Sequence, residues 1–198
     1  MPTEVVRQDE EAEEEQLTRY KATIEEFWAL PESMLPIEYV NGEIIMAPTP
    51  TVRHQAVLRN LAFALHEFVL RTRIGSIFFS PLDVVLPSGD VVQPDAFFLT
   101  NEETLRANVS KRVQGVPSFL VEVLSPGSIK HDARRKRELY ERNNVREYWI
   151  VDPRAKTVAQ LVRHGEHFEL TEFKEGDTIR GVVLDGFETT VGALINDR

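Results

Sequence analysis

The chain has 198 residues, of which 42% are hydrophobic, and this is enough for one buried core but not for two independent domains. The lack of cysteine excludes disulfides, thiolate zinc sites and a cysteine nucleophile, and it predicts a cytoplasmic protein. No apolar run reaches the length of about 18 residues that is needed to span a bilayer, so we expect no membrane partner. The formal net charge of −9 is unusual for a protein that binds nucleic acid, so the distribution of that charge matters.

Most of the acidity lies at the N-terminus. Residues 1–15 carry seven acidic side chains against Arg7, a net charge of −6, which leaves −3 for all later residues. A like-charged segment with few large apolar residues is typical of a disordered tail. We therefore expect residues 1–15 to form an acidic tail and residues 16–198 to form a single domain.

The first half of the domain contains clear helix and hairpin signals. Residues 16–30 predict a short helix that ends before Pro31. Residues 37–46 predict two strands around Asn41-Gly42, a strong hairpin signal. Residues 51–72 repeat apolar side chains at helical spacing and predict the longest helix.

Short strands follow this helix. We expect strands at 77–79, 84–86 and 96–99, the last two joined by a turn that contains Ser88-Gly89-Asp90. Residues 101–115 are polar and predict a loop or a weak helix.

The segment 119–151 predicts two parallel strands joined by a crossover helix. Residues 119–124 form an apolar run that is typical of a central strand. Ser128 is expected to cap a helix that runs to about Asn143, where Asn143-Asn144 would supply a left-handed residue. A strand at 148–151 follows, and residues 158–162, 168–173 and 182–184 predict an antiparallel C-terminal extension.

Glu122 is the most informative candidate residue because it interrupts that apolar run. A carboxylate inside a buried strand is costly unless it is paired, protonated or bound to a metal. Asp95 begins another apolar strand, and with the main-chain carbonyl of Val123 the two carboxylates would offer the oxygen ligands that Mg²⁺ prefers. The alternatives are a solvent-facing Glu122 on an edge strand and an Asp95 that only begins a strand.

The crossover helix adds a third element. Asp132, Lys136 and Tyr140 are spaced four residues apart and so share one helix face. Lys136 would orient a water molecule or stabilise charge that develops on a phosphate. The alternative is a surface pair between Asp132 and Lys136, with Tyr140 packed in the core.

The order of these motifs resembles that of the Uma-two family, a group of restriction-endonuclease-like proteins in the PD-(D/E)XK nuclease superfamily. The resemblance covers about residues 36–192. It rests on the segments 38–43, 93–95, 121–126 and 145–153 and on the single residues His54, Asp132, Lys136 and Tyr140. The resemblance implies an α/β fold with a mixed sheet core flanked by helices.

The resemblance also assigns roles to residues. It places Asp95 and Glu122 as metal ligands and Glu43 as an accessory acid. The superfamily lysine usually lies two residues after the glutamate, where this chain has Leu124, and Lys136 of the helix resembles a migrated substitute. His54 would contact phosphate or act near the metal, or else be a structural histidine at a helix start.

These residues favour a Mg²⁺- or Mn²⁺-dependent endonuclease acting on DNA, with Arg134, Arg135 and Arg137 for phosphate contacts. By analogy with restriction-type folds we expect a homodimer. The alternative is a non-catalytic module of the same fold that serves DNA binding or protein assembly, and activity on RNA is equally compatible with the sequence.

Overall fold

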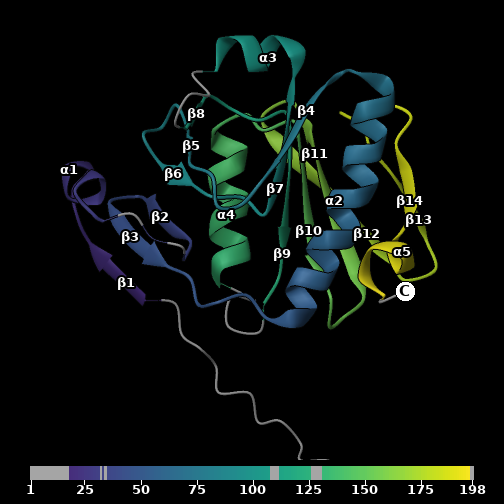
Figure 1. The fold of residues 1–198 in the computed structure, drawn as a ribbon, viewed down its shortest axis with the longest axis horizontal. Coiled ribbons are helices and arrows are strands. Elements are labelled where there is room, and N and C mark those ends of the chain that lie inside the picture. The colour runs from purple at the N-terminus through teal and green to yellow at the C-terminus, as the bar shows by residue number, and fades with distance from the viewer. Residues whose placement is uncertain (1–17, 32, 34, 108–111, 126–130, 197–198) are drawn as a thin grey trace, which may run out of the picture.

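The protein is built around a mixed six-stranded sheet (Figure 1). The computed structural model describes residues 18–31, 33, 35–107, 112–125 and 131–196, so the predicted acidic tail and the predicted cap at Ser128 lie outside the described residues. The strands of the central sheet, in spatial order, are β12 (His167–Lys174), β11 (Thr157–His164), β10 (Glu147–Asp152), β9 (Phe119–Val123), β7 (Ala96–Thr100) and β4 (Gly75–Phe79). Only β9 and β10 run parallel within it.

A second six-stranded sheet lies beside the first. Its strands, in spatial order, are β1 (Thr18–Lys21), β3 (Glu43–Met46), β2 (Ile37–Val40), β6 (Val91–Val92), β5 (Val84–Val85) and β8 (Val113–Gln114). Near the C-terminus, β13 (Thr178–Arg180) and β14 (Glu188–Thr190) form a separate antiparallel pair.

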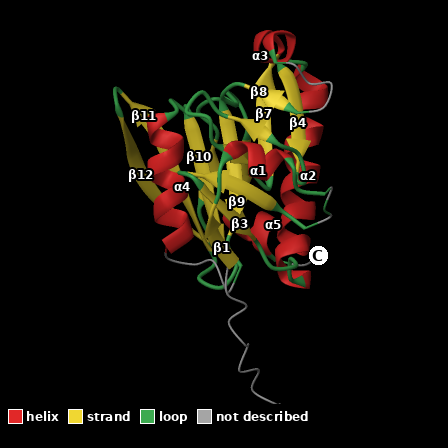
Figure 2. Ribbon diagram, turned by 90° about the vertical axis from the view of Figure 1, so that its left-hand side faces the viewer, coloured by secondary structure: helices red, strands yellow, loops and turns green. Residues whose placement is uncertain are grey.

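The described residues form five helices, three of which pack on the two faces of the central sheet (Figure 2). They are α1 (Ile24–Trp28), α2 (Val52–Thr72), α3 (Asn101–Arg106), α4 (His131–Arg142) and α5 (Val191–Ile195). One core cluster joins α2 and α5 to one face of the sheet, and another joins α4 and the second sheet to the opposite face. Among the described residues, no helix is long and apolar enough to cross a membrane.

Several local predictions are confirmed. Asn41 and Gly42 have φ angles of 54° and 77°, as a type I′ turn between β2 and β3 requires. The helix expected over residues 51–72 is α2, and Thr51 caps it by accepting a hydrogen bond from the backbone N–H of His54. Asn144, with φ of 64°, supplies the left-handed residue after α4. The central β9 and its parallel partner β10 also agree with the sequence.

The prediction of one helix over residues 16–30 is wrong. Residues 18–21 form β1, which pairs antiparallel with β3. Thr23 and Glu26 make a reciprocal capping box, so the helix begins only at Ile24. Pairing with a distant strand overrides the local helical pattern in the first part of this segment.

One predicted connection and one predicted strand are also wrong. The turn at Ser88-Gly89-Asp90 returns the chain to β6, which pairs with β5 in the second sheet, and β7 then begins in the central sheet. Residues 182–184 form bends rather than a strand, although β11 and β12 supply the expected antiparallel extension of the sheet. The crossing from β6 to β7 places Gln93 and Asp95 between the two sheets.

Candidate active site

A cavity of about 340 Å³ opens where the two sheets meet α2 and α4. Its polar lining consists of Glu38, His54, Gln55, Ser80, Gln93, Asp95, Glu122, Ser125 and Lys136. The apolar lining includes four prolines, Pro36, Pro48, Pro50 and Pro81. Charged side chains therefore gather in a recess with rigid, apolar walls.

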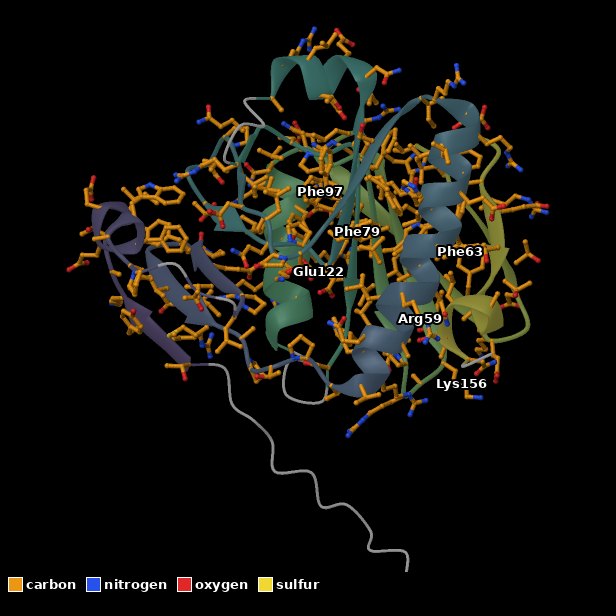
Figure 3. All side chains as sticks on the ribbon, in the orientation of Figure 1. Arg59, Phe63, Phe79, Phe97, Glu122 and Lys156 are labelled. Carbon is orange, nitrogen blue, oxygen red and sulfur yellow. The ribbon has the colours of Figure 1, made fainter. Side chains whose placement is uncertain are left out.

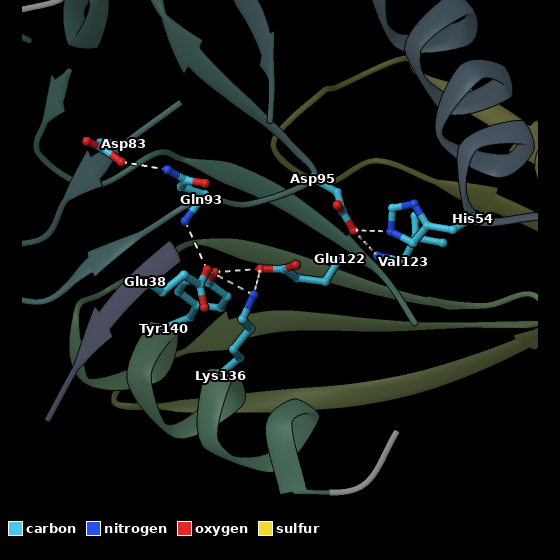
Figure 4. A network of polar contacts seen from close by, with 9 residues as sticks. All are labelled: Glu38, His54, Asp83, Gln93, Asp95, Glu122, Val123, Lys136 and Tyr140. Atoms are coloured by element: carbon cyan, nitrogen blue, oxygen red, sulfur yellow. Dashed lines mark hydrogen bonds and ion pairs between the residues drawn. The ribbon is translucent and has the colours of Figure 1, made fainter. Parts of the chain in front are cut away.

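Each charged residue reaches the cavity from a different element (Figure 4). Glu38 lies in β2, Glu122 is the fourth of the five residues of β9, and Lys136 lies in α4. His54 lies in the first turn of α2, and Asp95 lies just before β7. Because these elements are far apart in the sequence, only the folded chain assembles the site.

Asp95 and Glu122 come from neighbouring strands. The antiparallel register pairs Ala96 of β7 with Val121 of β9, so the next position outward brings Asp95 opposite Glu122. Directly opposed residues of an antiparallel pair project from the same face of a sheet. The two carboxylates therefore face the same cavity.

Lys136 bridges two buried carboxylates. Its Nζ lies 2.8 Å from Glu122 Oε1 and 3.1 Å from Glu38 Oε1. All three residues are less than 9% exposed. Burying such charges is unfavourable unless they compensate one another. The ammonium group of Lys136 thus forms ion pairs with both Glu38 and Glu122.

The electrostatics of Glu122 are dominated by burial. Burial raises the pKa of Glu122 from 4.5 to about 8, with Asp95 and Glu38 acting in the same direction and Lys136 opposing it. Burial likewise holds the pKa of Tyr140 well above 10, so its hydroxyl remains a donor and bonds Glu122 Oε1 at 2.7 Å. At neutral pH the raised pKa therefore favours the protonated form of Glu122, and a bound cation would favour the charged form.

Asp95 is held by two donors on one oxygen. Its Oδ2 accepts the backbone N–H of Val123 at 2.7 Å and lies 3.1 Å from Nε2 of His54. The other ring nitrogen of His54 is buried without a hydrogen-bond partner among the described residues. His54 therefore orients Asp95 from the side of α2.

The donor set suits a hard divalent cation. Within the described residues, the hydrogen bonds of Asp95 and Glu122 fall on Oδ2 and Oε1, which leaves Oδ1 and Oε2 for a ligand. No three His, Asp or Glu side chains in the described ranges converge enough to hold a metal alone. A cation here would therefore need the Val123 carbonyl and water as further ligands.

Glu38, and not Glu43, lines the cavity. The structure places Glu43 at the turn end of the hairpin, opposite Val40, and outside the cavity lining. Glu38 instead accepts the backbone N–H of Gln93 at 2.9 Å and contacts Lys136. Like Glu122, Glu38 is an acid inside an apolar strand, here residues 37–40, and this pattern could have identified it from the sequence.

The other predicted site residues are dispersed. None of the three arginines lines the cavity: Arg134 is exposed and paired with Glu138, Arg137 bonds the carbonyl of Phe168, and Arg135 is partly buried. The side chain of Asp132 lies outside the described part of the structure. Lys136 and Tyr140 are therefore the members of the helix face that the structure brings to Glu122.

Comparison with known proteins connects this geometry to a family. The family model of Uma2, described as putative restriction endonuclease, matches residues 24–192. The crystal structure of a putative nuclease belonging to DUF820 from Anabaena variabilis has the same fold, with a TM-score of 0.75 and 20% sequence identity over 87% of this chain and 97% of that chain. No curated protein matches the sequence. Because the family match spans most of the chain, this protein belongs to the Uma2 family of putative restriction endonucleases.

Proposed function

We propose that this protein is a divalent-metal-dependent endonuclease that hydrolyses phosphodiester bonds in DNA. The observation that supports the proposal most strongly is the arrangement of Asp95, Glu122 and Lys136 in one recess. Two carboxylates on adjacent strands and a buried ammonium are the groups that metal-assisted phosphodiester hydrolysis requires. The family match supports a nuclease, and the choice of DNA and of metal is part of the proposal.

In this proposal, Asp95 Oδ1, Glu122 Oε2 and the carbonyl of Val123 would hold Mg²⁺ or Mn²⁺. The ion, when bound, would polarise a phosphoryl oxygen and lower the pKa of a water molecule. His54 and the N–H of Val123 fix the orientation of Asp95. Tyr140 fixes Glu122 by donating to the oxygen that faces α4.

Lys136 has the role of orienting the attacking water and balancing charge on the phosphate. Its contacts with Glu38 and Glu122 hold the ammonium at the cavity. A buried ammonium that is held in place stabilises developing negative charge more strongly than one in water. Glu38 acts here as a positioning residue because its contact is with Lys136.

The test is cleavage of supercoiled and branched DNA in buffer with Mg²⁺ or Mn²⁺. The control is Asp95→Asn, which keeps an oxygen to accept the Val123 N–H but removes the charge. We expect cleavage by the native chain and its loss in the variant. Identical product patterns from both would contradict the proposal and favour a non-catalytic module with a nuclease fold.

A further inference from the structure

The outer face of α2 carries a line of large apolar side chains in contact with solvent. Val52, Phe63 and Leu70 are 88%, 69% and 68% exposed. Their spacings of eleven and seven residues correspond to about three and two helical turns, so the three side chains point in nearly the same direction. Isolated exposed apolar residues are common, but an aligned set along one helix marks a contact surface.

Opposite charges flank the centre of this line. Arg59 lies four residues before Phe63 and Glu67 lies four residues after it, so each is turned about 40° to one side of the Phe63 direction. Phe63 and Arg59 both project from α2 in Figure 3. When a second α2 helix runs in the opposite direction, its Glu67 lies beside Arg59 of the first helix and its Arg59 lies beside Glu67. The face is therefore complementary in charge to a second copy of itself.

We propose that a second copy of this chain docks on this face, with the two α2 helices antiparallel and a two-fold axis at Phe63. The axis brings Phe63 against the partner's Phe63 and Leu70 against the partner's Ala56. It also brings Arg59, whose guanidinium donates to Asn60 Oδ1 within the chain, to the partner's Glu67, twice by symmetry. Two-fold interfaces require this self-complementarity of one surface, and the spacing suits helices that pack side chains along a shared seam.

The surroundings of Phe63 favour the same arrangement. Phe63 itself borders a cavity of about 330 Å³, whose other lining residues are Arg59, Asn60, Ala64, Thr189, Ala193 and Leu194. This recess between α2 and the C-terminal elements offers space for an aromatic side chain of the second copy. Packing a side chain into such a pocket provides much of the affinity of an interface.

The edge of the central sheet is a less suitable contact between copies. The free edge strand β12 carries Glu169 and Glu172, and an antiparallel partner centred between them would set these two acids against each other. Charged residues on edge strands oppose such pairing. This charge pattern disfavours a contact between copies through β12.

The docking face is separate from the cavity. His54, nine residues before Phe63, points to the opposite side of α2 and is buried. The candidate active-site cavity of each copy would remain open in the dimer, with the two His54 residues about 27 Å apart along the helix axis. The oligomeric state can thus be measured independently of any nuclease activity.

The test is the molar mass of the full chain by size-exclusion chromatography with light scattering. We expect a dimer for the native chain, a monomer for Phe63→Glu, and a dimer for the control Leu105→Glu, whose side chain is 87% exposed on α3. Circular dichroism verifies that each variant is folded. A native chain that stays monomeric at its highest soluble concentration, or a dimer that survives Phe63→Glu, would overturn the proposal.

Charge exchange makes the test specific for the two-fold geometry. Arg59→Glu or Glu67→Arg alone should weaken the dimer by about tenfold or more, because each replaces two attractions with two repulsions. The double variant should dimerise again, and the two single variants should form a mixed dimer when combined. Failure of both the double variant and the mixture to associate would exclude the antiparallel register, as expected for a surface that binds a different protein.

Discussion

Lys136 Nζ on α4 lies 2.8 Å from Glu122 Oε1 in the central strand β9. This contact joins the helix to the strand at the cavity, and Glu38 completes it from the second sheet. In the proposed mechanism, Lys136 would take the place of the lysine that the superfamily usually has two residues after the glutamate. Position 124 is a leucine, and the ammonium arrives from the crossover helix instead.

Lys136→Met should remove turnover while metal binding persists. Methionine fills a similar volume without charge, so Glu122 and Glu38 lose their shared partner. We expect a loss of about 10²-fold or more in single-turnover cleavage rate. We also expect the free energy of unfolding to fall by about 3 kcal/mol without metal. Calorimetry with Mn²⁺ should still detect binding.

The matched control is Lys156→Met, which removes a half-exposed ion pair with Glu175. Its effects on turnover and stability should both be small. Loss of Mn²⁺ binding in Lys136→Met, with binding kept in the control, would show that Lys136 supports the metal rather than the reaction.

Glu38→Gln should lower turnover, whereas Glu43→Gln should not. The amide oxygen of glutamine can still accept the N–H of Gln93, so the fold is preserved while Lys136 loses one of its two acids. Comparing the cleavage rates of the two variants decides which carboxylate is the accessory acid. Equal rates for Glu38→Gln and the native chain, or a larger loss for Glu43→Gln, would return that role to Glu43.

His54→Ala should weaken Mn²⁺ binding by about 10- to 100-fold without abolishing it, because the residue orients Asp95 and is not itself a proposed ligand. The control is His66→Ala, an exposed position on the same helix. Calorimetric titration measures both. Unchanged affinity in His54→Ala would assign this histidine a purely structural role at the start of α2.

Glu147→Gln should destabilise the fold away from the cavity. This fully buried carboxylate accepts from Trp149 Nε1 and Gln160 Nε2 on Oε1, and from the N–H groups of Val182 and Val183 on Oε2. A glutamine would turn its own NH₂ toward donors and leave them unpaired. We expect a loss of about 2–3 kcal/mol in urea unfolding.

Glu169→Gln is the control for this effect, because its side chain is 72% exposed. Its unfolding midpoint should match that of the native chain. A similarly small change in Glu147→Gln would mean that the loop over residues 181–187 contributes little to stability.

Glu122 could be identified from the sequence because a buried acid appears there as a single charged residue inside an apolar strand. An acid within the apolar run 119–124 predicted a compensated carboxylate, and the structure supplies Lys136 and Tyr140 as its partners. The same pattern, an acid flanked by apolar residues in a strand, is present at Glu38 between Ile37 and Tyr39. The resemblance pointed to Glu43 beside the hairpin turn, although the apolar strand around Glu38 predicts a buried acid there.

Non-local pairing limited the rest of the prediction. The capping box of Thr23 and Glu26 is visible in the sequence, but the pairing of residues 18–21 with β3 is set by tertiary contacts. The division of β5 and β7 between two sheets likewise depends on long-range partners. That division places Asp95 between the sheets, so its exact surroundings required the structure.

The most direct test of the account is calorimetric titration of Mn²⁺ into the native chain and into Glu122→Gln. Glutamine keeps the size of the side chain and an oxygen for Tyr140, but removes the charge that would be shared with Asp95. The account predicts one binding site on the native chain that disappears in Glu122→Gln and persists in Glu43→Gln. Equal Mn²⁺ binding by the native chain and Glu122→Gln, or no binding by the native chain, would contradict it.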